Sequence, residues 1–300
     1  MQFYPASHYD DKANGFREIR TVPLASALAA EIRGVEIANI TDSQFEEIRT
    51  ALYLYKMIYF RSQDMSIDDQ ERLTLRFGPF GTDAYTGGMP GHPNVQRVVK
   101  EADTVVHRMF GETWHTDSSF LERPPAISLL YAVEVPPYGG DTWWSNTELA
   151  YQFLSDSMKQ LVSGLKVHMS ARDVLLSREE TARETGKTVG DIRLTDDQKR
   201  NIEGCWHPVV RTHPATGRKA LYVDHAYSLG LQGLDEDEGP AVLAFLKRHV
   251  AQEIFTCRLR WEKGTFVMWD NRSCIHYAFN DYDGYRREML RTIVDGEIPA

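Results

Sequence analysis

Cysteine is scarce in this sequence. The 300 residues contain three cysteines, Cys205, Cys257 and Cys274, and no two of them have the CxxC spacing of a zinc site. A small, odd number of cysteines is typical of a reducing compartment, where thiols stay free and pack as small hydrophobic side chains. We therefore expect neither a disulfide framework nor a cysteine-ligated metal.

Long hydrophobic runs and basic clusters are also missing. No apolar run approaches the roughly 18–20 residues that cross a bilayer, and the first residues lack the apolar centre of a signal peptide. The 34 basic and 43 acidic side chains give a net charge of −9, without a long run of lysine or arginine. These absences argue against a membrane or nucleic-acid partner. We expect a cytoplasmic protein that acts on a small molecule.

The sequence has no internal repeats and no proline-rich linker, so we expect one domain over residues 1–300. Capping-box patterns predict helices that begin directly after Thr41 and Ser66. The predicted helices span 41–54, 66–77, 146–163 and 235–249, and the predicted strands span 56–60, 95–99, 126–133, 207–213, 220–224, 255–261, 265–269 and 289–294. Many short strands with a few helices indicate a mainly β fold, a jelly roll that carries helical insertions.

Residues 172–204 differ from the rest of the chain because they are rich in charge and poor in large apolar groups. Two interpretations stay open. The segment is either a solvated helix or loop insertion, or a mobile lid that closes over a functional site.

Three residues fit a metal site. His115 and Asp117 form a His-x-Asp pair, and His276 lies far along the chain. Two histidines and one carboxylate are the ligand set of non-haem Fe(II) oxygenases, in which the protein occupies one face of the metal. Residues i and i+2 of a strand point to the same side, so the pair can bind one ion. The other histidines have no partner at such a spacing, and we expect them to be structural.

The segment after His276 predicts a strand, a turn and a second strand. Asparagine, aspartate and glycine at 280–284 carry the turn signal. A hairpin there would place His276 directly opposite Arg287, and Arg291 would share that face of the sheet. Arginine binds carboxylates through two parallel hydrogen bonds. A dicarboxylate that chelates the metal at one end and pairs with arginine at the other fits this arrangement, and 2-oxoglutarate is such a molecule.

Four segments carry a resemblance to a known family: WHTDSSF (114–120), PPYGGDTWW (136–144), HPVVRTHPATGRKALYV (207–223) and WDNRSCIHYAFNDYDGYRREMLRT (269–292). In these segments the chain resembles the Fe(II)/2-oxoglutarate-dependent dioxygenases of the taurine and 2,4-dichlorophenoxyacetate dioxygenase group. The resemblance implies a double-stranded β-helix that uses Fe(II), 2-oxoglutarate and O2. It also implies hydroxylation of a small substrate, with release of succinate and CO2 and often with cleavage of the product.

The resemblance further implies roles for single residues. His115, Asp117 and His276 would be the catalytic iron ligands. Arg287 and Thr142 would hold the far carboxylate of 2-oxoglutarate.

Two more residues would stand close to these groups. Arg291 would lie near substrate and co-substrate and meet an anionic substrate group, while Trp269 would stand close to the metal. The carboxylate of Asp117 implies hydroxylation, because halogenating relatives lack it.

The substrate pocket departs from the taurine dioxygenase pattern. Those enzymes have a histidine and a tyrosine shortly after a Phe-Gly pair, and an asparagine before the first ligand. Here Asp83 and Thr86 take the first two places, with Tyr85 one residue away, and Gly111 takes the third. Together with Ser118, which follows the carboxylate ligand, Asp83, Tyr85 and Gly111 are the candidate pocket residues. We expect an alkyl sulfonate, a sulfate ester or an aryloxy-carboxylate rather than taurine.

Three alternatives remain open. The same cofactor chemistry could act on a natural-product substrate, with hydroxylation, desaturation or epimerisation as the outcome. A zinc hydrolase on the same fold would use the same ligand types but would leave Arg287 and Arg291 unexplained. A non-catalytic jelly-roll binding module could lack any of the ligands, and all of them are present. The relatives commonly form dimers or tetramers, so the resemblance implies a homo-oligomer.

Overall fold

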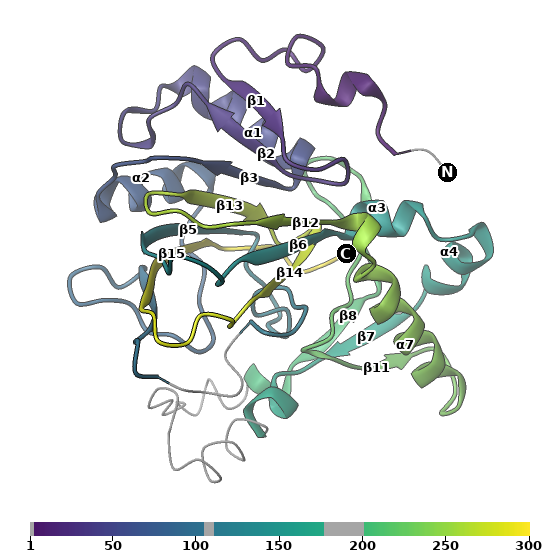
Figure 1. Cartoon of the computed structure of the whole chain (residues 1–300). Helices are drawn as coiled ribbons and strands as arrows, with labels where there is room; N and C mark the ends of the chain where they lie inside the picture. The colour runs from purple at the N-terminus through teal and green to yellow at the C-terminus, as the bar shows by residue number, and fades with distance from the viewer. Residues whose placement is uncertain (1–2, 105–110, 177–200) are drawn as a thin grey trace.

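The computed structural model describes residues 3–104, 111–176 and 201–300 of the chain (Figure 1). Within these residues the strands form four sheets, flanked by helices. The fold is mainly β with some helices, as the sequence predicts. The sequence left the lid interpretation open for residues 172–204. Most of that segment, residues 177–200, lies outside the described residues. No helix of the described part is long and apolar enough to cross a membrane.

The largest sheet has seven strands. In spatial order they are β1 (Arg20–Pro23), β2 (Ala30–Arg33), β3 (Met57–Phe60), β13 (Phe266–Asp270), β5 (Ile127–Glu134), β15 (Arg287–Val294) and β4 (Gln96–Lys100). Only β2 and β3 pair in parallel, and the other neighbours in this sheet are antiparallel.

The remaining sheets are smaller. One contains β12 (Thr256–Leu259), β6 (Thr142–Asn146) and β14 (Cys274–Ala278), in that order; a second contains β11 (Ser228–Gln232), β7 (Lys166–Met169) and β8 (Cys205–Pro208); and β9 (Val210–Thr212) pairs with β10 (Lys219–Leu221). The predicted strand over 207–213 is therefore divided between two sheets.

The large sheet is buried on both faces. Along β3, Met57 and Tyr59 belong to a core cluster that also contains Trp144 and Ile275 of the β12–β6–β14 sheet. The alternating residue Ile58 belongs to a second cluster, which includes residues of the helices on the opposite face. Strands that are buried on both faces appear as continuous apolar runs in a sequence, which explains why the segment around β3 was recognisable.

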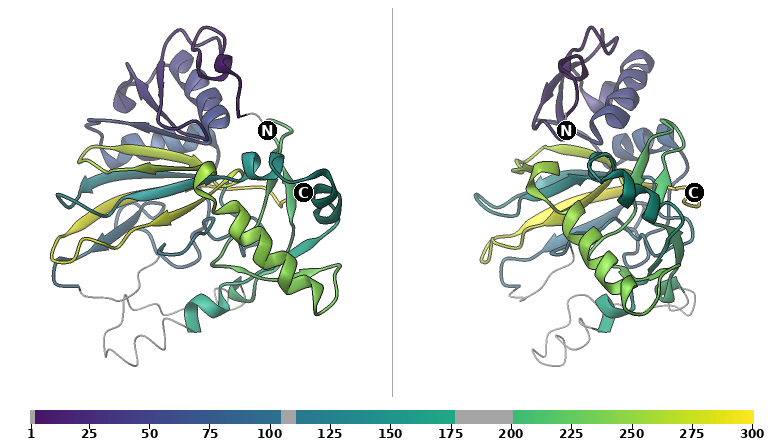
Figure 2. Two further views of the ribbon diagram at one scale, coloured as in Figure 1. Left: turned by 45° about the vertical axis from the view of Figure 1, so that its right-hand side comes forward. Right: turned by 90° about the vertical axis from the view of Figure 1, so that its right-hand side faces the viewer.

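Helices α1 (Asp42–Tyr55) and α2 (Ile67–Phe77) begin at the predicted capping boxes, in which Thr41 and Ser66 accept from the third backbone amide. The single helix predicted over 146–163 is two helices, α3 (Thr147–Gln152) and α4 (Asp156–Val162). The break occurs because Ser155 caps α4 with its side chain. Other described elements include α7 (Glu238–Val250), η1 (Ala6–Tyr9), η2 (Ile37–Asn39) and η3 (Glu253–Phe255). Figure 2 shows α7 beside the β11–β7–β8 sheet.

The hairpin predicted after His276 is wrong. β14, which carries His276, pairs with β6, whereas β15, which carries Arg287, pairs with β5 and β4 of the large sheet. The turn residues at 280–284 therefore belong to a connection between two sheets. A turn signal fixes where the chain reverses, but it does not fix which strand becomes the partner.

Candidate metal centre and active site

His115 and His276 form an isolated antiparallel bridge. The amide of His115 donates to the carbonyl of His276 at 3.0 Å, and the reverse bond is 2.8 Å long. The bridge holds the two imidazoles side by side, with ring centroids 4.0 Å apart. His276 is fixed in turn by β6, where it lies opposite Trp144. Two candidate ligands that are far apart in the sequence are thus joined by backbone hydrogen bonds.

Asp117 lies in a turn two residues after His115. Its Oδ1 is 4.0 Å from Nε2 of His115 and 3.7 Å from Nε2 of His276, and one ligand atom from each residue lies within 4.8 Å of the other two. Nδ1 of His115 is 2.7 Å from the carbonyl of Thr113. Because a carbonyl only accepts, Nδ1 carries the proton and Nε2 keeps its lone pair for a metal.

A buried aspartate stabilises the turn around Asp117. Asp224 Oδ2 accepts from the amide of Thr116 at 3.3 Å and from the hydroxyl of Ser119 at 2.9 Å. Ser118 adopts a φ of 43°, a left-handed conformation that non-glycine residues rarely adopt. The tight turn directs Asp117 back toward the histidines. Asp224 holds this turn through hydrogen bonds on both sides of Ser118.

The protonation states suit metal binding. Burial would raise the pKa of Asp117, but nearby His276 and Arg291 together hold it below its usual value. Burial is also the main cause that lowers the pKa of His276 to about 3, and His115 lowers it further. An ionised carboxylate and a neutral imidazole are the forms that coordinate a metal.

Arg287 and Thr142 meet at Trp261. The indole nitrogen of Trp261 donates to Thr142 Oγ1 at 3.0 Å, and the guanidinium carbon of Arg287 lies 5.6 Å from the centre of the same ring system. Arg287 is buried, and its Nε has no hydrogen-bond partner. Burial lowers the pKa of Arg287 while Tyr282 opposes this effect, and arginine stays charged in proteins. A buried cation with an unused N–H group is suited to receive an anion.

Arg291 lies between two carboxylates. Its Nη1 is 3.4 Å from Asp117 Oδ1, and its Nη2 donates to Asp83 Oδ2. Asp83 also accepts from the amides of Tyr85 and Thr86, at 2.9 and 2.6 Å. Burial lowers the pKa of Arg291, but the two carboxylates outweigh it and raise this pKa above its usual value. The direct contact between Arg291 and Asp83 is one that the sequence does not predict.

Two further sequence candidates lie against the histidines. The ring of Trp269 is 5.0 Å from that of His276. Gly111 has a φ of +89°, accepts from the amide of Ala278 at 2.8 Å, and lies so close to His115 that an added Cβ would be 3.5 Å from its Cε1. An added Cβ would also lie 3.2 Å from Cβ of Ala278, and the positive φ disfavours any other residue, which suits glycine there.

Tyr85 belongs to an aromatic group beside the histidines. The centroid of its ring lies 5.5 Å from the ring centroid of Phe120. The ring centroids of Phe120 and Tyr227 are 5.0 Å apart. The ring of Tyr227 in turn lies 6.4 Å from the imidazole of His115. These rings form an aromatic group that leads from His115 to Tyr85, whose backbone amide donates to Asp83.

One other group of possible ligands occurs in the described residues. Asp68, Glu71 and His92 lie together near the first turns of α2, where His92 Nδ1 is 2.8 Å from Glu71. This group is not predictable from the sequence, because its histidine lies far from the acids in the chain. The contact is that of a surface ion pair, and nothing near it resembles the arginines of the first site.

Three buried polar residues around Asp117 and its turn were not among the residues predicted from the sequence. They are Ser128, Asn271 and Asp224, and all three are at most 1% exposed. Each is a polar residue within or directly after an apolar strand segment. A buried polar group requires a partner, so the position of Ser128 in an otherwise apolar strand was an available signal.

The geometry can now be set beside known proteins. A family model described as "Taurine catabolism dioxygenase TauD, TfdA family" matches residues 20–293. The chain belongs to this family. It is therefore a 2-oxoglutarate-dependent non-haem iron dioxygenase, and the resemblance recognised in the sequence is confirmed.

Two curated relatives illustrate the range of the family. An alpha-ketoglutarate-dependent sulfate ester dioxygenase from Pseudomonas putida is 32% identical over 94% of this chain and 91% of its own length. An alpha-ketoglutarate-dependent 2,4-dichlorophenoxyacetate dioxygenase from Cupriavidus pinatubonensis is 30% identical, over 90% of this chain and 95% of its own length. Both likenesses span nearly the whole chain.

Solved structures agree with this assignment. A taurine dioxygenase from Burkholderia xenovorans has a TM-score of 0.76 at 29% identity, covering 95% of this chain and 91% of its own. AAD-2, solved in complex with Mn(II) and N-oxalylglycine, has a TM-score of 0.73 at 26% identity, covering 94% and 99%.

Proposed function

We propose that His115, Asp117 and His276 hold Fe(II), and that the chain uses this centre to hydroxylate a small anionic organic substrate. The observation that carries the proposal is the convergence of two imidazole nitrogens and one ionised carboxylate within 4.8 Å, beside the buried Arg287 and the half-buried Arg291. Two histidines and a carboxylate fit Fe(II) and leave its other face open. The arginines argue against a zinc hydrolase, which would have no use for them.

The residues also fit 2-oxoglutarate. Arg287 would receive its far carboxylate, because the guanidinium is buried and its Nε lacks a partner. Thr142, which shares Trp261 with Arg287, would add a hydroxyl to the same carboxylate. Trp269, packed on His276, would limit access of water to the centre. When bound, the iron and 2-oxoglutarate together supply oxygen activation through decarboxylation to succinate and CO2.

The proposal includes the architecture. We infer that residues 1–300 form a single catalytic domain whose large sheet and β12–β6–β14 sheet make up a double-stranded β-helix, a jelly roll. The shared apolar core between these sheets supports it, as does the bridge that joins His115 to β14. A homo-oligomer, dimer or tetramer, belongs to the same proposal, and light scattering after size-exclusion chromatography would measure it.

The substrate class rests on Arg291 and on the relatives. Proteins named as a sulfate ester dioxygenase, an alkylsulfatase and a 2,4-dichlorophenoxyacetate dioxygenase are all similar to this chain. Arg291 would meet the anionic group of such a substrate, while Tyr85, Gly111 and Ser118 would shape the space beside it. We therefore propose a sulfate ester, an alkyl sulfonate or an aryloxy-carboxylate as the first candidate class of substrate.

One observation favours a second candidate. Arg291 already pairs with Asp83 and lies 3.4 Å from Asp117, so an anionic substrate must compete with a buried carboxylate for it. The same cofactor chemistry on a neutral, natural-product-like substrate would need no such competition. Hydroxylation, desaturation and epimerisation are the possible outcomes of that reaction.

Succinate release tests the proposal. Purified protein with Fe(II), ascorbate and 2-oxoglutarate would be offered hexyl sulfate, hexanesulfonate, 2,4-dichlorophenoxyacetate and uncharged analogues of similar size. We expect substrate-dependent succinate with at least one anion, and none from His276→Ala. Succinate with the uncharged compounds alone would favour the neutral, natural-product-like substrate. If the protein released no succinate, either with or without any of these compounds, both candidates would be contradicted.

A further inference from the structure

A chain of hydrogen bonds leads away from Asp117 into the large sheet. Ser128 Oγ donates to Asp117 Oδ2 at 2.5 Å, and Asn271 Nδ2 donates to Ser128 Oγ at 2.9 Å. The indole nitrogen of Trp269 donates to Asn271 Oδ1, also at 2.9 Å. All four residues are buried.

The donor and acceptor roles along this series of hydrogen bonds follow from the indole group of Trp269. An indole nitrogen can only donate, so the oxygen of the Asn271 amide must face Trp269. The amide nitrogen of Asn271 therefore faces Ser128 and donates to its oxygen. The hydroxyl of Ser128 has one proton, and that proton is left for Asp117. Each link thus fixes the orientation of the next.

The sheet holds the donors in place. Ser128 lies opposite Trp269 where β5 pairs with β13. Asn271 follows β13 directly, and its backbone amide donates to the carbonyl of Ala126 at 2.9 Å. The three donors therefore belong to the large sheet, while the candidate ligand His276 belongs to the β12–β6–β14 sheet. This series of hydrogen bonds connects Asp117 to the large sheet, which does not carry His276.

The two oxygens of Asp117 are consequently unequal. Oδ2 accepts from Ser128, whereas Oδ1 faces Nε2 of His115 at 4.0 Å and Nε2 of His276 at 3.7 Å, with Nη1 of Arg291 at 3.4 Å, a longer contact than that of Ser128. We propose that Ser128 and Asn271 are positioning residues that reserve Oδ1 of Asp117 for the metal, so that this carboxylate binds through one oxygen. The inference rests on the proposed ligand set, and it adds roles for two residues: Ser128, and Asn271, which lies within the quoted segment 269–292 but had no role assigned from the sequence.

Fe(II) affinity measures this role. Ser128→Ala leaves Oδ2 without its donor, and we expect Fe(II) binding to weaken by about 10–100-fold, the usual effect of losing a partner of a metal ligand. Asn271→Ala leaves the hydroxyl in place but free to rotate, so we expect a smaller loss. The double variant should bind no more weakly than Ser128→Ala, because Asn271 acts through Ser128. Anaerobic titration with Fe(II) and equilibrium dialysis give these affinities.

Ser145→Ala is the matched control. Ser145 is equally buried, on β6, and its hydroxyl donates to the carbonyl of Val250 at 2.5 Å rather than to Asp117. We expect its Fe(II) affinity to equal that of the wild type. Thermal unfolding without metal would show whether a loss of affinity reflects a loss of fold, and Asn271→Ala remains as a test should Ser128→Ala not fold.

The outcomes separate the two proposals. Wild-type affinity in Ser128→Ala, with none in His276→Ala, would overturn the positioning role and leave the ligand set intact. Additive losses in the double variant would also overturn it, because Asn271 would then act independently. A wild type that binds no Fe(II) would instead overturn the ligand set itself.

Discussion

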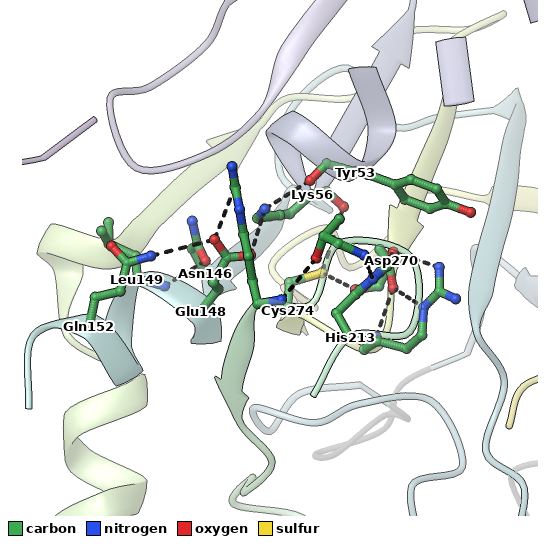
Figure 3. Close-up of polar contacts among 12 residues, drawn as sticks. Tyr53, Lys56, Asn146, Glu148, Leu149, Gln152, His213, Asp270 and Cys274 are labelled. Atoms are coloured by element: carbon green, nitrogen blue, oxygen red, sulfur yellow. Dashed lines mark hydrogen bonds and ion pairs between the residues drawn. The ribbon is translucent and has the colours of Figure 1, made fainter. Parts of the chain in front are cut away.

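Lys56 Nζ lies 2.7 Å from Glu148 Oε2, and each side chain is only 2% exposed (Figure 3). Lys56 directly follows α1 and Glu148 lies in α3, the helix that follows β6, so the pair joins these two helices. Burial lowers the pKa of Lys56, and Glu148 opposes this effect. Glu148 also contacts Arg218 at 3.2 Å. Removing Glu148 would leave the buried Lys56 charge without its carboxylate partner.

Glu148→Ala should therefore lower the free energy of unfolding by about 3–5 kcal/mol, measured by urea denaturation. Glu46→Ala is the control, because Glu46 pairs with Arg49 on the surface, where the side chains are 56% and 45% exposed. Its effect should stay below about 1 kcal/mol. Similar losses in the two variants would show that burial does not govern the Lys56 pair.

Asp270 gives a pH dependence. Burial would raise its pKa, but Arg272 and His213, which contact it at 2.8 Å, hold that pKa far below its usual value. The pKa of an aspartate in the unfolded chain is about 4. Ionised Asp270 therefore stabilises the folded state above about pH 4, and this contribution to stability is lost progressively as the pH falls below that value. Asp270→Asn should be less stable than the wild type at pH 7, and the difference should shrink toward pH 3. Urea denaturation at several pH values checks this, and a constant difference would contradict it.

Arg287→Ala should raise the KM for 2-oxoglutarate. Loss of a buried charge pair costs on the order of 2–5 kcal/mol, which corresponds to more than tenfold. Arg286→Ala is the matched control, since that side chain pairs with Glu101 and Glu134 at the surface. Equal KM values in the two variants would mean that another residue holds the carboxylate.

Asp83→Asn separates the two candidate substrates. The change keeps the shape of the side chain but removes the charge that Arg291 now compensates. For an anionic substrate we expect the KM to fall by more than tenfold, because like charges held close together cost several kcal/mol and about 1.4 kcal/mol already corresponds to tenfold. For an uncharged substrate the KM should change little. Succinate release at varied hexyl sulfate concentration makes the comparison, and a raised KM for the anion would show that Asp83 assists it.

Local signals in the sequence predicted local structure well. The capping boxes at Thr41 and Ser66 located the starts of α1 and α2, because a cap is a contact between residues three apart. The spacing of His115 and Asp117 likewise pointed to the cluster that the fold brings together with His276.

Contacts between strands were less predictable. The alternation of residues in β14 and β15 shows which side chains share a face, but it does not tell which strand lies alongside, and the predicted hairpin failed for that reason. The same limit hid the contact of Arg291 with Asp83 and the hydrogen bonds of Ser128. These depend on the order of strands in the large sheet.

The most direct test of the account is the visible spectrum of the metal-free protein after anaerobic addition of Fe(II) and then 2-oxoglutarate. The account predicts a weak metal-to-ligand charge-transfer band that requires both additions and is absent in His276→Ala and Asp117→Ala. A protein that binds Fe(II) and 2-oxoglutarate without this band, or shows the same band in both variants, would contradict the assignment of His115, Asp117 and His276 as the iron ligands.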